Sequence, residues 1–170
     1  MPEKKQTGVT DAKVFKWITE QFADAKILRY KVPGFEALSL KQKELIYYLS
    51  QATLAGRDIT YDQNCKYNLL VRKTLEAIYT DFKGDRSGDD FKNFTVYLKR
   101  VWFSNGIHHH YSTDKFFPEF SKDYFASLLR STDLQTLPLK PKQTIGDFIN
   151  EVTPIIFDTD IAPKRVNQNP

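Results

Sequence analysis

The residues best suited to chemistry gather in one stretch, residues 97–120, which contains every histidine of the chain. Three consecutive histidines, residues 108–110, follow Ser104 and Asn105 at the expected end of a helix. Aromatic rings, imidazoles, an amide and hydroxyls thus occur within one short loop, and loops on a rigid scaffold often carry binding residues. The same composition also fits a polar connection whose histidines face solvent. The residue types alone leave both interpretations open.

A metal site is the first chemistry that three histidines suggest, but their spacing limits it. Neighbouring residues of an extended chain point to opposite sides, so His108 and His110 can converge while His109 points away. The loop then supplies two ligands at most, and the chain lacks the H-E-x-x-H pattern that places zinc beside a general base. We therefore expect no metal site within this chain and interpret the histidines as loop or substrate-contact residues.

Two nucleophile arrangements are less favoured still. Ser104, His108 and Asp114 have the residue types of a hydrolase triad, but the G-x-S-x-G turn that exposes such a serine is missing. Cys65 is the only cysteine, which excludes an internal disulfide and a cysteine zinc site. The second arrangement would pair the Cys65 thiol with a distant histidine, but a single cysteine with no local signature is more often inert than reactive. We expect no catalytic residue in this chain.

The elements that must position this loop have the spacing of amphipathic helices. Apolar residues repeat at three- and four-residue steps from Phe91 to Trp102, which predicts a helix before the loop. The same spacing continued to Asn105 places its amide on the core-facing side, and Gly106 can end the helix. After the loop, Ser121 can cap a further helix.

The N-terminal part is expected to begin with a helix capped by Thr10 or Asp11 and running to about Ala25. Residues 27–32 are ambiguous, because they also alternate like a short strand.

A second helix is expected to begin at Ser39, which forms a capping-box pattern with Gln42. Gly56 is expected to end it in the left-handed conformation. Its expected buried face consists of Leu45, Tyr48, Leu49, Ala52 and Ala55.

Further along, residues 57–64 are predicted to be a polar connection and residues 67–82 a helix. Thr144 and Asp147 begin the last helical segment, which Pro154 should bend or fray. The whole pattern predicts a mainly α fold, an antiparallel assembly of five or six helices. We expect three regions: a disordered leader at 1–9, a helical domain at 10–160, and a linker or truncated end at 161–170.

The composition restricts the partners. The 25 Lys and Arg residues against 21 Asp and Glu give a net charge of +4, and these charges are interspersed rather than clustered into a nucleic-acid-binding stripe. No apolar segment approaches the roughly 20 residues that span a membrane. We expect neither nucleic acid nor a membrane as partner. The first residues lack the apolar region of a secretory signal, so a cytoplasmic location is expected, with export after signal removal as the alternative.

Two stretches carry a family resemblance. LKQKELIYYLSQATLAGRDI, residues 40–59, is similar to a K/R-L-Y-x-x-x-L-S-x-A-x-x-x-G pattern, and residues 96–129 are similar to a V-Y-x-N-x-G…D-x-K-F-x-P segment. Both patterns occur in the zinc-dependent dipeptidyl peptidase III family, which the chain resembles over most of residues 13–165. The triple histidine resembles the bacterial, Bacteroides-type branch of that family.

The resemblance implies a two-lobed metallopeptidase, a hydrolase that releases dipeptides from the N-terminus of short peptides. It implies zinc in the other lobe, held by an H-E-x-x-G-H helix and a later glutamate, neither of which this sequence contains. The chain would then be the N-terminal segment of the lobe without the zinc motif. By itself it would be inactive and would bind no zinc, and its partners would be the remaining lobe and a short peptide.

In that family the loop after the S-N pair faces the cleft between the lobes. The resemblance therefore implies that Tyr111 lines the substrate site, with polar contacts from Asn105, His108, His109 and His110. The alternative hypothesis is an autonomous helical module that binds a peptide or a protein through the same loop. A reading frame that continues past Pro170 to an H-E-x-x-G-H motif would favour the peptidase.

Overall fold

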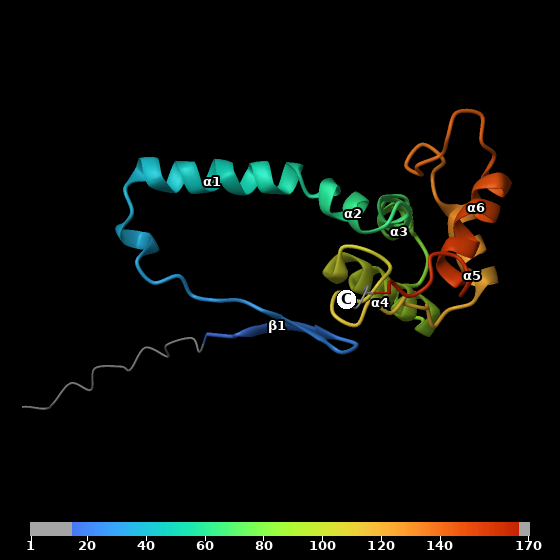
Figure 1. Ribbon diagram of the computed structural model, residues 1–170, viewed down its shortest axis with the longest axis horizontal. Coiled ribbons are helices and arrows are strands. Elements are labelled where there is room, and N and C mark those ends of the chain that lie inside the picture. The colour runs from blue at the N-terminus through green and yellow to red at the C-terminus, as the bar shows by residue number, and fades with distance from the viewer. Residues whose placement is uncertain (1–14, 167–170) are drawn as a thin grey trace, which may run out of the picture. The chain divides into compact units, whose positions relative to one another are not determined.

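A computed structural model describes residues 15–166 of the chain, and the described part is mainly helical (Figure 1). The chain divides into two units after residue 38, and the described parts of these units are residues 15–38 and 39–166. The first unit contains the strands β1 (Ile18–Phe22) and β2 (Ala25–Leu28) and a 3-10 turn, η1 (Phe35–Ala37). The second contains α1 (Leu40–Ala55), α2 (Asp58–Asn64), α3 (Asn68–Asp81), α4 (Asp89–Ser104), α5 (Lys122–Ser131) and α6 (Ile145–Phe157). None of the helices described in residues 15–166 is long and apolar enough to cross a membrane.

The N-terminal unit is a β-hairpin where a helix was predicted. β1 and β2 pair antiparallel around a tight turn in which Ala23 has a positive φ of 46°. The helix predicted to run to Ala25 is therefore wrong from Phe15, the first described residue, onward, and its predicted cap at Thr10 or Asp11 lies outside the described residues. β-branched residues such as Ile18 favour a strand, and pairing across the turn outweighs the helical spacing. The strand alternative for residues 27–32 holds as far as Leu28.

The second predicted helix is present as α1, and its capping box is confirmed. The Ser39 hydroxyl accepts from the Gln42 amide, and the Gln42 side chain accepts from the Ser39 amide at 2.9 Å. The predicted left-handed end is wrong, because Gly56 has right-handed angles of −85° and −2°. The chain therefore passes from α1 into α2 with only a short break.

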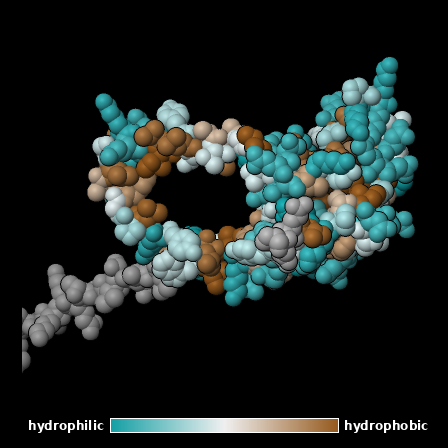
Figure 2. Space-filling model, viewed as in Figure 1, coloured by the Kyte–Doolittle hydropathy of each residue, from teal (hydrophilic) through white to brown (hydrophobic). Residues whose placement is uncertain are grey.

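The buried face predicted for α1 is also wrong. α1 lies wholly within the described residues and has no buried residue. Five consecutive apolar residues, 45–49, place apolar side chains on every side of the helix, so spacing alone could not select one face. Figure 2 shows hydrophobic side chains on the first half of α1. Over the whole of α1, the large apolar side chains exposed by more than half are Leu40, Leu45, Tyr47, Tyr48, Leu49 and Leu54.

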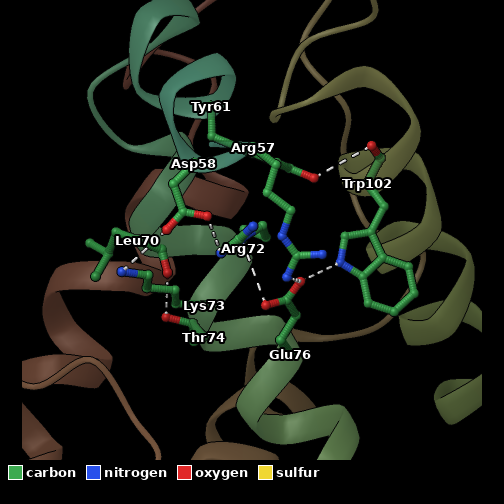
Figure 3. A network of polar contacts seen from close by, with 9 residues as sticks. All are labelled: Arg57, Asp58, Tyr61, Leu70, Arg72, Lys73, Thr74, Glu76 and Trp102. Atoms are coloured by element: carbon green, nitrogen blue, oxygen red, sulfur yellow. Dashed lines mark hydrogen bonds and ion pairs between the residues drawn. The ribbon is translucent and has the colours of Figure 1, made fainter. Parts of the chain in front are cut away.

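Residues 57–64, predicted to be a polar connection, form the helix α2 instead. Arg72 of α3, whose side chain is almost fully buried, donates to the Asp58 carboxylate at 2.8 Å (Figure 3). The Arg72 guanidinium also lies over the Tyr61 ring, 4.8 Å from its centroid, and Tyr61 is buried. These partners come from α3, so a tertiary contact decides the structure of a segment whose own sequence is polar.

The core of the helical unit is formed by α3 to α6 and the segments between them. The helices predicted over residues 67–82 and from Phe91 to Trp102 are confirmed as α3 and α4, and Ser121 caps α5. Thr144 and Asp147 form the capping box of α6, which continues through Pro154 to Phe157. The largest fully buried side chains are Tyr97, Phe94, Phe125, Phe148, Leu75 and Ile78, so aromatic rings supply much of the core.

Tyr97 carries a polar atom that this core does not satisfy. Its hydroxyl is one of the buried side-chain atoms that have no hydrogen-bond partner within the described part of the chain, and burial raises the pKa of Tyr97. Tyr97→Phe is therefore expected to raise the free energy of unfolding by about 0.5–1.5 kcal/mol, since a buried unpaired hydroxyl is costly. Urea titration at pH 7 measures the change.

The matched control is Tyr61→Phe, which should bring no gain because the Tyr61 hydroxyl donates to the Trp102 carbonyl at 3.5 Å. Alkaline pH gives a second readout. In the unfolded chain Tyr97 ionises near pH 10, whereas in the folded chain it stays neutral, so the wild-type protein loses stability as the pH rises above about 10. Tyr97→Phe should reduce that alkaline loss, and an unchanged slope would contradict the assignment.

Candidate functional site

The loop after α4 is a closed turn whose two arms pair with each other. The Phe116 amide donates to the Ile107 carbonyl at 2.8 Å, and the His109 amide donates to the Asp114 carbonyl at 2.6 Å. Residues 108 and 115 form an antiparallel bridge between these two bonds. The loop is therefore a short hairpin-like structure over residues 107–116, with its tip at residues 110–113. We call it the histidine loop.

The start of the histidine loop is fixed by Asn68 of α3. The Asn68 side chain accepts from the Ile107 amide at 3.0 Å and donates to the Asn105 carbonyl at 3.3 Å. Asn105, rather than Gly106, supplies the left-handed C-cap of α4, with φ of 52° and ψ of 39°. Asparagine tolerates this conformation well. Asn105 is thus a partly buried corner residue, and Asn68, whose role no sequence motif signalled, determines where the loop begins.

The last turn of α4 is held from a second side by the polar network in Figure 3. The Trp102 indole donates to the Glu76 carboxylate of α3 at 2.9 Å. The second Glu76 oxygen lies 3.6 Å from the Arg72 guanidinium. The same arginine binds Asp58 at 2.8 Å, so α2, α3 and the end of α4 are joined through one cation. The histidine loop consequently leaves a rigid helix end.

His108 faces the C-terminal segment and is buried, with 3% of its surface exposed. Its Nε2 lies 2.8 Å from the Pro163 carbonyl and 3.0 Å from the Ala162 carbonyl. Carbonyl oxygens only accept hydrogen bonds, so Nε2 carries the proton. Nδ1 is buried and is among the atoms without a hydrogen-bond partner in the described residues. His108 and His110 therefore face different surroundings rather than converging on one point.

His109 caps the tip of the loop through its side chain. Its Nδ1 accepts from the Tyr111 amide at 3.1 Å and from the Ser112 amide at 3.0 Å. A nitrogen that accepts two backbone donors is unprotonated, so the proton of the neutral ring is on Nε2. Alternation along an extended strand predicts only that His109 points away from His108 and His110, whereas in this closed turn the His109 ring bonds to the backbone of the loop tip.

The exposed side of the loop carries a row of aromatic rings. The His110 ring lies 5.1 Å from Phe103, 4.6 Å from His109 and 4.2 Å from Tyr111, measured between centroids. Tyr111 ends the row and has 83% of its surface exposed. We call these four residues the ring row. It presents apolar ring faces beside imidazole nitrogens, a combination suited to both side-chain and main-chain groups of a ligand.

The candidate triad is not assembled. Ser104 lies 3.4 Å from His110 Nδ1 rather than beside His108. Asp114 is paired with Lys164 at 2.9 Å, and the hydrogen bond from Lys164, followed by that from Ser112, lowers the pKa of the Asp114 carboxyl. The three residue types occur in the loop, but the serine, imidazole and carboxylate do not form a chain of hydrogen bonds.

Metal ligands do not converge in the described residues either. Within residues 15–166 no group of three or more His, Cys, Asp or Glu side chains is placed to hold a metal ion. His109 uses Nδ1 for the loop backbone, and His108 uses Nε2 for carbonyls, so one nitrogen of each ring is already engaged. The described side chains thus form no group of three ligands around a common point.

No family model matches the chain, and no curated protein matches it.

Proposed function

We propose that this chain forms one wall of the substrate cleft of a zinc dipeptidyl peptidase, a larger two-lobed enzyme that releases dipeptides from the N-terminus of short peptides. The observation that carries the proposal is Tyr111, a tyrosine with 83% of its surface exposed at the tip of a loop that is hydrogen-bonded at both ends. An exposed ring held on an ordered loop costs little conformational entropy when a ligand binds. The family resemblance supplies the reaction, and the ring row supplies the contact surface.

The groups of the ring row suit a short peptide. A peptide offers apolar side chains, carbonyl acceptors and amide donors within a few ångströms. Tyr111 and Phe103 provide ring surface, while His110 and the Tyr111 hydroxyl provide polar atoms beside it. In this proposal the described residues bind and orient the peptide, and zinc, held by the remaining lobe, would supply a Lewis acid.

The exposed surface of α1 also supports a larger parent protein. A helix that is apolar on every side is normally enclosed by other elements. Between residues 45 and 56 the chain has no charged residue, which suits an apolar environment. The remaining lobe of the proposed enzyme would provide that environment.

The second candidate is an autonomous helical module that binds a peptide or a protein. The observation that favours it is the core formed by α3 to α6, which encloses its own aromatic cluster around Phe120. Such a module would bind its ligand through the ring row with no reaction. The two candidates differ in three expected properties. Only the peptidase should hydrolyse a dipeptidyl substrate, require zinc and have a reading frame that continues to an H-E-x-x-G-H motif.

The decisive test compares the chain with the product of its complete reading frame. The chain by itself, incubated with a dipeptidyl arylamide and added zinc, is expected to release no arylamine. A reading frame that continues to H-E-x-x-G-H should encode a protein that does so and that loses the activity with a chelator and regains it with zinc. Zinc-dependent turnover that co-purifies with the isolated chain would contradict the proposal. A complete frame without the motif would favour the binding module.

A further inference from the structure

We infer that Lys115 is a positioning residue, which holds the histidine loop against residues 158–165 and thereby places the ring row. Its Nζ donates to the Asp158 carbonyl at 2.5 Å and to the Ile161 carbonyl at 2.6 Å. Only 7% of the Lys115 surface is exposed. The consequence for peptides rests on the proposed function, whereas the consequence for the loop itself does not.

The environment of Lys115 differs from an ordinary ion pair. Two main-chain carbonyls, rather than a carboxylate, accept its hydrogen bonds. The ammonium therefore bridges the backbone at residues 158 and 161. Burial is the main influence on the pKa of Lys115 and lowers it, while the negative charge of Asp158 acts in the opposite direction. A buried amine that loses these carbonyls would be costly, and carbonyls that lose their donor would be costly as well.

Lys115 acts together with two other loop residues. His108, its partner across the antiparallel bridge, bonds to the Ala162 and Pro163 carbonyls. The Thr113 hydroxyl donates to the Arg165 carbonyl, and the Thr113 carbonyl accepts from the Arg165 amide at 3.1 Å. One side of the histidine loop is thus bound to residues 158–165, while Tyr111 projects into solvent. Loss of the two Lys115 hydrogen bonds is expected to increase the mobility of the loop tip, which carries Tyr111.

A second lysine contact between the same segments provides a matched control. Lys164 pairs with Asp114 at 2.9 Å, but both side chains are more than half exposed. Exposed ion pairs contribute little to structure, because solvent screens them and two long side chains must be ordered. Lys164→Met removes the same charge as Lys115→Met from the same interface, without emptying a carbonyl-lined site.

The test follows the loop directly in the complete chain. In Lys115→Met, amide hydrogen exchange at His109 and Phe116 is expected to be at least tenfold faster, while exchange at Leu75 in the core changes by less than twofold. Nitrogen-15 NMR should show His109 losing its single Nε2-protonated form, because its cap on Tyr111 and Ser112 opens. Lys164→Met should leave the exchange rates within twofold of the wild type. It should also leave His109 in its single Nε2-protonated form.

Chemical rescue separates positioning from general stabilisation. Lys115→Ala removes a propylammonium group, so millimolar propylammonium chloride should restore protection at Phe116, whereas tetramethylammonium, which has no N–H donor, should not. Unchanged exchange at His109 and Phe116 in Lys115→Met, or an equal rise at Leu75, would overturn the inference. A loosened loop with unaltered peptide turnover in the complete enzyme would uphold the role of Lys115 and contradict the proposed role of the ring row.

Discussion

Gly106→Ala is expected to lower the free energy of unfolding by about 2–5 kcal/mol, through backbone strain and loss of the Asn68 hydrogen bonds. Gly106 has a φ of +153°, which a side chain disfavours. A Cβ added there would lie 2.1 Å from Asn68 Nδ2 and 2.4 Å from Asn68 Cγ. Asn68 is buried and bonds to both Asn105 and Ile107, so it cannot move aside without releasing the start of the histidine loop. Chemical denaturation measures the loss.

Gly88→Ala is the matched control for this substitution. Gly88 precedes α4 with a φ of −64°, and the nearest atom to its added Cβ is the Asp85 carbonyl oxygen at 4.0 Å. The expected change is about 0.5 kcal/mol or less, as for most surface substitutions. If Gly106→Ala were no more destabilising than Gly88→Ala, the close packing between Asn68 and the loop would not exist in solution.

Tyr111→Ala should lower kcat/KM of the complete enzyme about 5- to 150-fold, the range that corresponds to losing ~1–3 kcal/mol of ring contact with the peptide. The physical reason is that an exposed ring contributes to binding only when a ligand covers it. With 83% of its surface exposed, Tyr111 contributes little to folding, so the melting temperature should stay nearly constant. Zinc content should also stay constant, since within residues 15–166 no group of three or more potential ligands is placed to hold a metal ion. Dipeptidyl arylamide kinetics measure the effect.

Tyr111→Phe is the control that keeps the ring and removes the hydroxyl. It should retain most of the activity if ring contact dominates, and it should resemble Tyr111→Ala if the hydroxyl is the essential group. Unaltered kinetics in Tyr111→Ala would remove the ring row from the substrate site. A variant that unfolds would make Tyr111 a structural residue, against its exposure in the folded chain.

Helices that are specified by residues close to one another in the sequence were predictable. The repeats from 67 to 82 and from Phe91 to Trp102 correspond to α3 and α4, because one apolar stripe per helix is enough to determine which side is buried. The caps at Ser39 and Thr144 were predictable for a similar reason: each joins residues three apart. Where the information is not local, the predictions were wrong. The hairpin at β1 and β2 depends on pairing across a turn, and α2 depends on Arg72 of α3.

The sequence by itself determined that rings, imidazoles and hydroxyls share one loop, because they are neighbours along the chain. Only the tertiary structure decided which of them face outward. His108 is buried because carbonyls at residues 162 and 163 meet it, and Lys115 is anchored by residues 158 and 161; these contacts join segments more than 40 residues apart. His109 is turned into the loop because two backbone donors need an acceptor at a closed tip. Alternation along a strand predicts none of this, since the direction of each side chain follows from hydrogen bonds that form only when the distant segments have packed.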